Sequence, residues 1–161
     1  MKIPFCTPVQ AKRYTDYLTS RYGISLSTMK KWSWIQHKEN VFVVDSSWVP
    51  LASNAASGLN IFSLGLQVFS NGKTFAPTSN FITLFGEHIR QNIIELPETK
   101  LMSLFGRTHV TIENARPEHV LSDGWVAVSL NGKIIASGEL RVKHLIPNLP
   151  GSSHGSESEK E

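Results

Sequence analysis

The sequence predicts an α+β fold, in which an N-terminal mixed α/β domain with an antiparallel sheet (residues 1–90) precedes a mostly β C-terminal domain (residues 91–147). Three observations predict it: a strong helix-start signal near the N-terminus, later apolar segments that are short and rich in β-branched residues, and turn signals between those segments. The 161 residues, 40% apolar and 18% charged, can fill a core and amount to about one domain of usual length. Residues 148–161 have one large apolar side chain, Leu149, and are predicted to be a disordered tail.

The first helix is predicted to span residues 8–22. Thr7 can act as the N-cap, Pro8 fits the first helical position, and Gln10 completes a capping box. Gly23 supplies the usual terminator. One apolar stripe at helical spacing is expected to face the core, namely Ala11, Tyr14, Leu18 and Tyr22.

A β-hairpin is predicted after this helix. Its polar turn is residues 37–40, and its apolar strand residues are Met29, Trp32, Trp34 and Ile35 on one side and residues 41–44 on the other. Trp32 and Trp34 lie on the same side of one strand, where they either pack against the first helix or stack on nucleic-acid bases. Core packing is the favoured interpretation of the two tryptophans.

A second helix and a long strand are predicted to complete the first domain. Residues 48–56 repeat apolar side chains at helical spacing, with Ser46 or Ser47 as the N-cap. Residues 59–69 alternate as in a strand. The apolar residues of segment 81–89 fit both the helical and the strand period, and a strand that passes into a turn of helix is the favoured prediction.

The second domain is predicted to contain a short strand, a short helix and three further strands. They are expected at residues 92–96, at residues 97–105, and at residues 108–112, 125–130 and 133–142. Leu101, Leu104 and Phe105 are expected to point inward from the helix. Asn131–Gly132 joins the last two strands and is the strongest short-range hairpin signal in the chain.

No motif of the standard enzyme classes is present. The sequence has no phosphate-binding glycine loop, no His-Glu-x-x-His, no Cys-x-x-Cys and no Gly-x-Ser-x-Gly. The six histidines stand in different elements, and Cys6 is the single cysteine. Glu118, His119 and Asp123 adjoin in a predicted loop, where neighbouring side chains usually point apart and stay solvated. We therefore expect no catalytic residue, no metal site and no cofactor.

The sequence also predicts no membrane contact. The most apolar stretch, residues 59–69, carries polar side chains and falls short of the roughly 20 residues of a membrane span. Lys12 and Arg13 follow only a short mixed stretch, so no signal peptide is expected. One cysteine fits a reducing compartment, which predicts a cytosolic or nuclear location.

Positive charge is concentrated at the front of the chain. Residues 1–38 hold seven Lys or Arg against Asp16 alone, an excess of +6, whereas the whole chain carries +3. An excess of this size suits weak attraction to nucleic acid or another polyanion, with a solvated surface as the alternative. Four of these cations, called the N-terminal basic set below, form a predicted secondary basic surface: Lys12, Arg13, Lys30 and Lys31.

The second domain offers the main candidates for binding a nucleic-acid backbone. In the last predicted strand Arg141 and Lys143 alternate with apolar residues, which puts both cations on one solvent face, and His144 follows. Arg107 and His109 flank the turn after the short helix. An ordinary solvated strand and a plain helix C-cap are the alternatives. The predicted RNA-binding set is Arg107, His109, Lys133, Arg141, Lys143 and His144.

The order of motifs resembles a known arrangement. The second half, with Ser103-Leu-Phe-Gly-Arg-Thr-His-Val110, then Asp123-Gly-Trp-Val-Ala-Val128, then Gly132-Lys-Ile-Ile-Ala-Ser-Gly138, resembles a PUA domain, an RNA-binding β-barrel. The first half, with its opening helix, Val41-Phe-Val-Val44, Leu51-Ala-Ser-Asn54 and Ser63-Leu-Gly65, is similar to the companion domain of the Nip-seven family of large-subunit ribosome-biogenesis factors. The resemblance covers roughly residues 1–147.

The resemblance implies a non-catalytic, monomeric protein that binds single-stranded pre-ribosomal RNA with a preference for uridine-rich sequences. It implies ribosome-assembly proteins as partners, and a location that is cytoplasmic in an archaeon and nucleolar or nuclear in a eukaryote. It maps a basic edge onto Arg141, Lys143 and His144, and a helix-to-strand turn onto Arg107 and His109. Two alternatives remain at this point: the RNA-positioning PUA subunit of a modification enzyme, and a protein-only adaptor.

Overall fold

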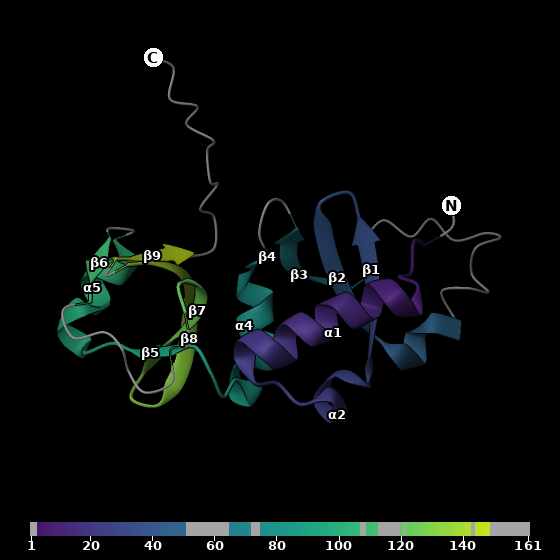
Figure 1. The fold of residues 1–161 in the computed structure, drawn as a ribbon, viewed down its shortest axis with the longest axis horizontal. Helices are drawn as coiled ribbons and strands as arrows, with labels where there is room; N and C mark the ends of the chain where they lie inside the picture. Colours follow the sequence, from purple (N-terminus) through teal and green to yellow (C-terminus); the bar gives the residue numbers. More distant parts are fainter. Residues whose placement is uncertain are drawn as a thin grey trace, which may run out of the picture.

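The computed structural model describes residues 3–50, 65–71, 75–106, 109–112, 120, 122–142 and 144–148. Their fold is α+β, built on two sheets that lie beside each other (Figure 1). The first half contains α1 (Pro8–Tyr22), α2 (Leu26–Met29), β1 (Trp32–His37), β2 (Asn40–Asp45), β3 (Leu66–Asn71), β4 (Phe75–Pro77) and α4 (Ser79–Phe85), with 3-10 turns at Ser46–Trp48 and Gly86–His88. The second half contains β5 (Ile93–Glu95), a 3-10 turn at Glu98–Lys100, α5 (Leu101–Phe105), β6 (Val110–Thr111), β7 (Gly124–Leu130), β8 (Lys133–Arg141) and β9 (His144–Asn148).

The first helix follows its sequence signals residue by residue. Thr7 accepts from the Gln10 backbone N–H at 3.3 Å, the Gln10 side chain accepts from the Thr7 backbone, and Gly23 ends α1 in the left-handed conformation. The predicted stripe faces inward, since Tyr14, Leu18 and Tyr22 are buried. The predicted helix and its orientation are confirmed.

The four-stranded antiparallel sheet has the order β1-β2-β3-β4. Its first hairpin is confirmed, with residue 32 paired to residue 45 and residue 37 to residue 40. Trp34 is buried and stacks on Tyr14 with ring centroids 5.4 Å apart, and Trp32 packs edge-on against Phe85. Trp34 therefore packs against the first helix, as the favoured interpretation predicted, whereas Trp32 is partly buried and packs against α4. Met29, however, lies in α2 and not in the first strand.

The prediction of a strand at residues 81–89 is wrong. Residues 79–85 form α4, and a 3-10 turn follows. Phe81 and Phe85, four residues apart, are both fully buried, so the helical period decides the structure of this segment. Of the helix predicted at 48–56 and the strand predicted at 59–69, residues 51–64 lie outside the described residues, and β3 begins at Leu66.

The second sheet has the order β5-β7-β8-β9-β6 and curls into an incomplete barrel (Figure 1). The β7–β8 hairpin is confirmed, with positive φ at both Asn131 and Gly132. The single long strand predicted at 133–142 is wrong at its end. Val142 has φ 57°, β8 stops at Arg141, and β9 returns antiparallel beside it. Phe105, predicted to point inward, is 54% exposed, whereas Leu104 is buried.

The two halves share side chains and hydrogen bonds. The buried core of the first half includes Trp125 and Ala127 of β7. Arg21 donates to the Trp125 carbonyl at 2.7 Å and to both the hydroxyl and the carbonyl of Ser122. Asn92, fully buried, donates from its side chain to the Arg21 carbonyl at 2.5 Å. These contacts fix α1 against the start of β7.

A second connection lies at the end of β9. Asn148, the first residue of the predicted tail, pairs with Ser137 and donates from its side-chain amide to the Pro77 carbonyl at 2.6 Å. Residues 149–161 lie outside the described residues. None of the described helices has the length and apolar character needed to cross a bilayer.

Candidate nucleic-acid interface

The structure brings three of the six predicted RNA-binding residues onto one face of the second sheet. Arg141 pairs with His144 across β8 and β9, and His144 pairs in turn with Thr111 of β6. His109 directly precedes β6, and we infer from the β alternation of Val110 and Thr111 that its side chain lies on the same face as Thr111. We call Arg141, His144 and His109 the hairpin-end set.

Burial of the alternate residues fixes the direction of this face. Leu140, Val110 and Leu145 are buried in the second core, so the positions between them point outward. Arg141, His144 and His109 are all exposed. The face therefore presents a guanidinium and two imidazoles to solvent, groups that bind phosphate oxygens and stack on bases.

Carboxylates moderate the charge of the hairpin-end set. Arg141 forms an ion pair with Glu139 two residues earlier on the same face, with 2.8 Å between its Nη2 and Oε2, and this hydrogen bond raises the pKa of Arg141. Asp123 accepts a hydrogen bond from the Val142 backbone N–H at 3.1 Å and so holds the turn between β8 and β9. An RNA phosphate at Arg141 would share the guanidinium with Glu139.

Lys100 belongs to the same end of the barrel, although no motif in the sequence predicted this. Its ammonium donates to the Thr111 carbonyl, which places a further cation beside the hairpin-end set. Residues 100 and 111 meet because β6 closes on β9 after α5, and no local spacing in the sequence encodes that contact.

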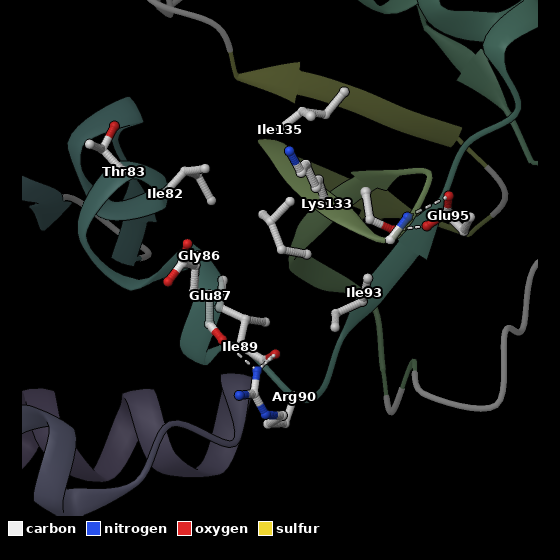
Figure 2. Close-up of a pocket in the computed structure, with 13 residues that line it drawn as sticks. Ile82, Thr83, Gly86, Glu87, Ile89, Arg90, Ile93, Glu95, Lys133 and Ile135 are labelled. Carbon is white, nitrogen blue, oxygen red and sulfur yellow. Dashed lines mark hydrogen bonds between the residues drawn. The ribbon is translucent and has the colours of Figure 1, made fainter.

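Lys133 lies elsewhere. It begins β8, whereas Arg141 ends it, so the two lie eight residue steps apart, about 26 Å along the strand. Figure 2 shows Lys133 beside a groove between α4 and the second sheet. The structure therefore divides the predicted RNA-binding set. Arg107 and Lys143 lie outside the described residues.

The N-terminal basic set is also divided. Arg13 lies over the Phe75 ring of β4, with its Cζ 4.8 Å from the ring centroid, and Lys31 lies over Trp32 of β1, with its Nζ at 5.1 Å. β1 and β4 are opposite edges of one sheet, so these two cations do not share a patch. Lys12 is paired with Asp16 at 2.5 Å, and Lys30 is exposed in the turn before β1.

The other described polar groups that could form a site are the candidate metal ligands and the Cys6 thiol. Among the described residues, no group of three or more His, Cys, Asp or Glu is placed to hold a metal ion. Cys6 is half-buried, and burial raises the pKa of its thiol, which disfavours the reactive thiolate. The hairpin-end set remains the candidate interface in the described part of the second half.

Comparison with known proteins identifies the fold. No protein-family model matches the chain, and no curated protein matches it by sequence. A solved structure described as a conserved PUA domain protein from Thermoplasma acidophilum matches 93% of this chain and 95% of its own, with a TM-score of 0.60 and 15% sequence identity. The match extends over both halves, so the molecule has a PUA-containing α+β fold. Membership of the Nip-seven family stays a prediction.

Proposed function

We propose that this protein is a non-catalytic RNA-binding factor that assists large ribosomal subunit biogenesis and pre-rRNA processing. The observation that carries the proposal is the match of both halves, together and in order, to a protein described by its PUA domain. The motif resemblance of the first half to the Nip-seven companion domain supports the ribosomal assignment.

The hairpin-end set supplies the chemistry of this function. Arg141 would bind a phosphate, while His144 and His109 would stack on or hydrogen-bond to bases that a single strand leaves accessible. Phosphate contacts carry no sequence information, so binding through this face would be salt-sensitive and only weakly sequence-specific. A preference for uridine-rich strands would come from the histidines and from neighbouring residues.

The proposal includes partners and place of action. The ligand is single-stranded pre-rRNA, the partners are ribosome-assembly proteins, and the protein acts as a monomer without a cofactor. It acts in the cytoplasm of an archaeon or in the nucleolus or nucleus of a eukaryote.

Crosslinking in cells followed by sequencing of the bound RNA tests this function. The expected result is enrichment of large-subunit pre-rRNA, lost when Arg141 and Lys143 are both replaced by alanine. The matched control is Lys38→Ala, which removes an exposed cation from the β1–β2 turn. Enrichment of a modification enzyme's RNA substrates would indicate an RNA-positioning subunit instead, and a protein partner without RNA would indicate an adaptor.

A further inference from the structure

A groove of about 700 Å³ lies between the two halves of the molecule (Figure 2). α4 and the turn after it form one wall, and β5 with the β7–β8 hairpin forms the other. The aliphatic part of its lining is Ile82, Ile89, Ile93, Ile134 and Ile135. Four of these isoleucines are only half-buried, so the groove offers an apolar surface that this chain leaves partly open.

The walls of the groove are held in place. The hydrogen bonds of Arg21 and Asn92 join α1 to β7, and the Asn148 side chain joins the end of β9 to the residue that closes β4. α4 follows β4 directly, and a Cβ at Gly86 would lie only 3.5 Å from Ile134 of β8. A preformed groove binds with less loss of conformational entropy than one that must be assembled.

The charged side chains around the groove differ in whether they already have a hydrogen-bond or ion-pair partner. Glu95 accepts hydrogen bonds from the Ser129 hydroxyl and the Gly132 N–H, and Arg90 donates to the Glu87 and Ile89 carbonyls at 2.6 and 2.9 Å. Among the described residues, the Lys133 ammonium has no hydrogen bond or ion pair, and neither has the Glu87 carboxylate on the opposite wall. The exposed Lys133 ammonium is therefore available for an acidic partner group.

These features favour a protein ligand over RNA. No aromatic side chain lines the groove among the described residues, so bases have nothing to stack on. Glu87 and Glu95 balance Arg90 and Lys133, so the lining has no net positive charge with which to attract a polyanion. A segment with aliphatic side chains complements the isoleucines, a carboxylate on it complements the free Lys133 ammonium, and a cation on it would complement the Glu87 carboxylate.

We propose that this groove is a docking site for a segment of a partner protein that presents aliphatic side chains to the isoleucines and an acidic side chain to Lys133. The segment binds between the two halves, at the end of β8 opposite to the hairpin-end set. This site goes beyond the RNA-binding function and does not depend on it.

Site-specific photocrosslinking in cells locates the occupant. Thr83 lines the groove from α4 and is exposed, so p-benzoylphenylalanine can replace it without entering the core. The expected product is an adduct to one partner protein, in which mass spectrometry finds a peptide with aliphatic and acidic residues. An RNA adduct, an adduct to residues 149–161 of this chain, or no adduct would overturn the proposal.

A synthetic peptide of the crosslinked sequence then tests the charge pairing with the purified full chain. Lys133→Glu should weaken its binding about tenfold, because the reversal replaces an attraction with a repulsion. The control Lys38→Glu changes the net charge by the same amount in the β1–β2 turn, away from the groove, and should leave peptide binding unchanged. A peptide whose acidic residue is changed to lysine should regain affinity for Lys133→Glu. Equal losses in both variants, or no regain, would overturn the proposal.

The same crosslinker at Val142 separates the two functions. Val142 is 76% exposed in the β8–β9 turn beside Arg141. RNA adducts are expected there, and their absence would contradict the proposed RNA-binding function while leaving the groove result as it stands. Circular dichroism of both substituted proteins verifies that they fold.

Discussion

The two ends of β8 carry cations in contrasting surroundings. Arg141, at the end of the strand, is paired with Glu139 on an outer face that it shares with two exposed histidines. Lys133, at the start, has no such partner within the described residues and borders a groove lined by isoleucines. One strand thus presents positive charge to two different chemical environments.

The surroundings of each cation determine which ligand we propose for it. Beside imidazoles on a polar face, a guanidinium binds phosphate and leaves bases accessible to stack. Beside aliphatic side chains and balanced carboxylates, an ammonium selects a carboxylate on an apolar segment. We therefore propose RNA as the ligand of the hairpin-end set and a protein segment as the ligand of the groove.

Arg21→Ala is expected to have the largest effect on stability, because the Arg21 guanidinium holds the two halves together. It makes three hydrogen bonds to Ser122 and Trp125, next to the Asp123 that holds the β8–β9 turn. Their loss should lower the free energy of unfolding by about 3 kcal/mol, since it removes three charge-assisted hydrogen bonds that join the two halves. Chemical denaturation measures this, with Lys12→Ala on the same helix as a control that should cost little.

Gly138→Ala should break the hairpin end while sparing the groove. A Cβ at residue 138 would lie 2.9 Å from the Ile146 carbonyl oxygen and 2.8 Å from the Leu145 side chain, which forces β8 and β9 apart. We expect a loss of about 2 kcal/mol in thermal denaturation. Gly86→Ala is the matched control on the groove wall, because its Cβ makes ordinary contacts of 3.5 Å and more. Equal losses in the two variants would contradict the assignment of the strain to the β8–β9 pairing.

Replacing both Arg141 and Lys143 by alanine should weaken binding to single-stranded RNA about tenfold and lower the salt slope by about 1.4, as expected for two lost phosphate contacts. The loss should be similar for different sequences. Titrations at two salt concentrations measure it, and thermal stability should stay unchanged because Arg141 is exposed. Unaltered affinity at both concentrations would remove this strand end from the RNA interface.

Lys133→Ala tests whether the cation at the start of β8 contributes to RNA binding. The lysine lies about 26 Å of strand from Arg141, so its removal should change RNA affinity by less than about twofold. The same titration as for Arg141 and Lys143 measures this. A loss equal to that of the double variant would mean that RNA reaches the groove.

Deletion of residues 149–161 is expected to have the smallest effect. The segment has one large apolar residue and carries net negative charge, which opposes a polyanion. Thermal stability should be unchanged, and RNA affinity equal or slightly higher. The deletion keeps Asn148, whose hydrogen bond to Pro77 joins the halves. A clear fall in melting temperature would show that the deleted segment docks on the fold.

Local signals in the sequence predicted the elements that local chemistry determines. The capping box at Thr7 and the Asn131–Gly132 turn each gave the correct element, because their hydrogen bonds and dihedral angles involve neighbouring residues. The prediction failed where a signal was ambiguous or missing. The apolar residues of segment 81–89 fit both the helical and the strand period. Val142 has a positive φ, which a β-branched residue rarely adopts, so the sequence does not indicate a turn there.

The candidate site could be predicted only in part for the same reason. Alternation along the last strand put Arg141 outward, yet it could not show that the chain turns at Val142 and places His144 opposite Arg141. The contacts of Arg21 with Ser122 and of Lys100 with Thr111 arise from tertiary packing. Such tertiary contacts distribute the basic residues over several surfaces. Counting charges along the sequence cannot predict this distribution.

Backbone amide chemical shifts of the full chain, followed during titration with single-stranded, uridine-rich RNA, test most directly whether RNA binds at the hairpin-end set and not at the groove. We predict that the largest changes in chemical shift fall on Arg141, His144, His109 and Thr111, and that the shifts of Lys133 and α4 stay unchanged. Largest changes at the groove or over the N-terminal basic set, with none at the β8–β9 turn, would contradict it.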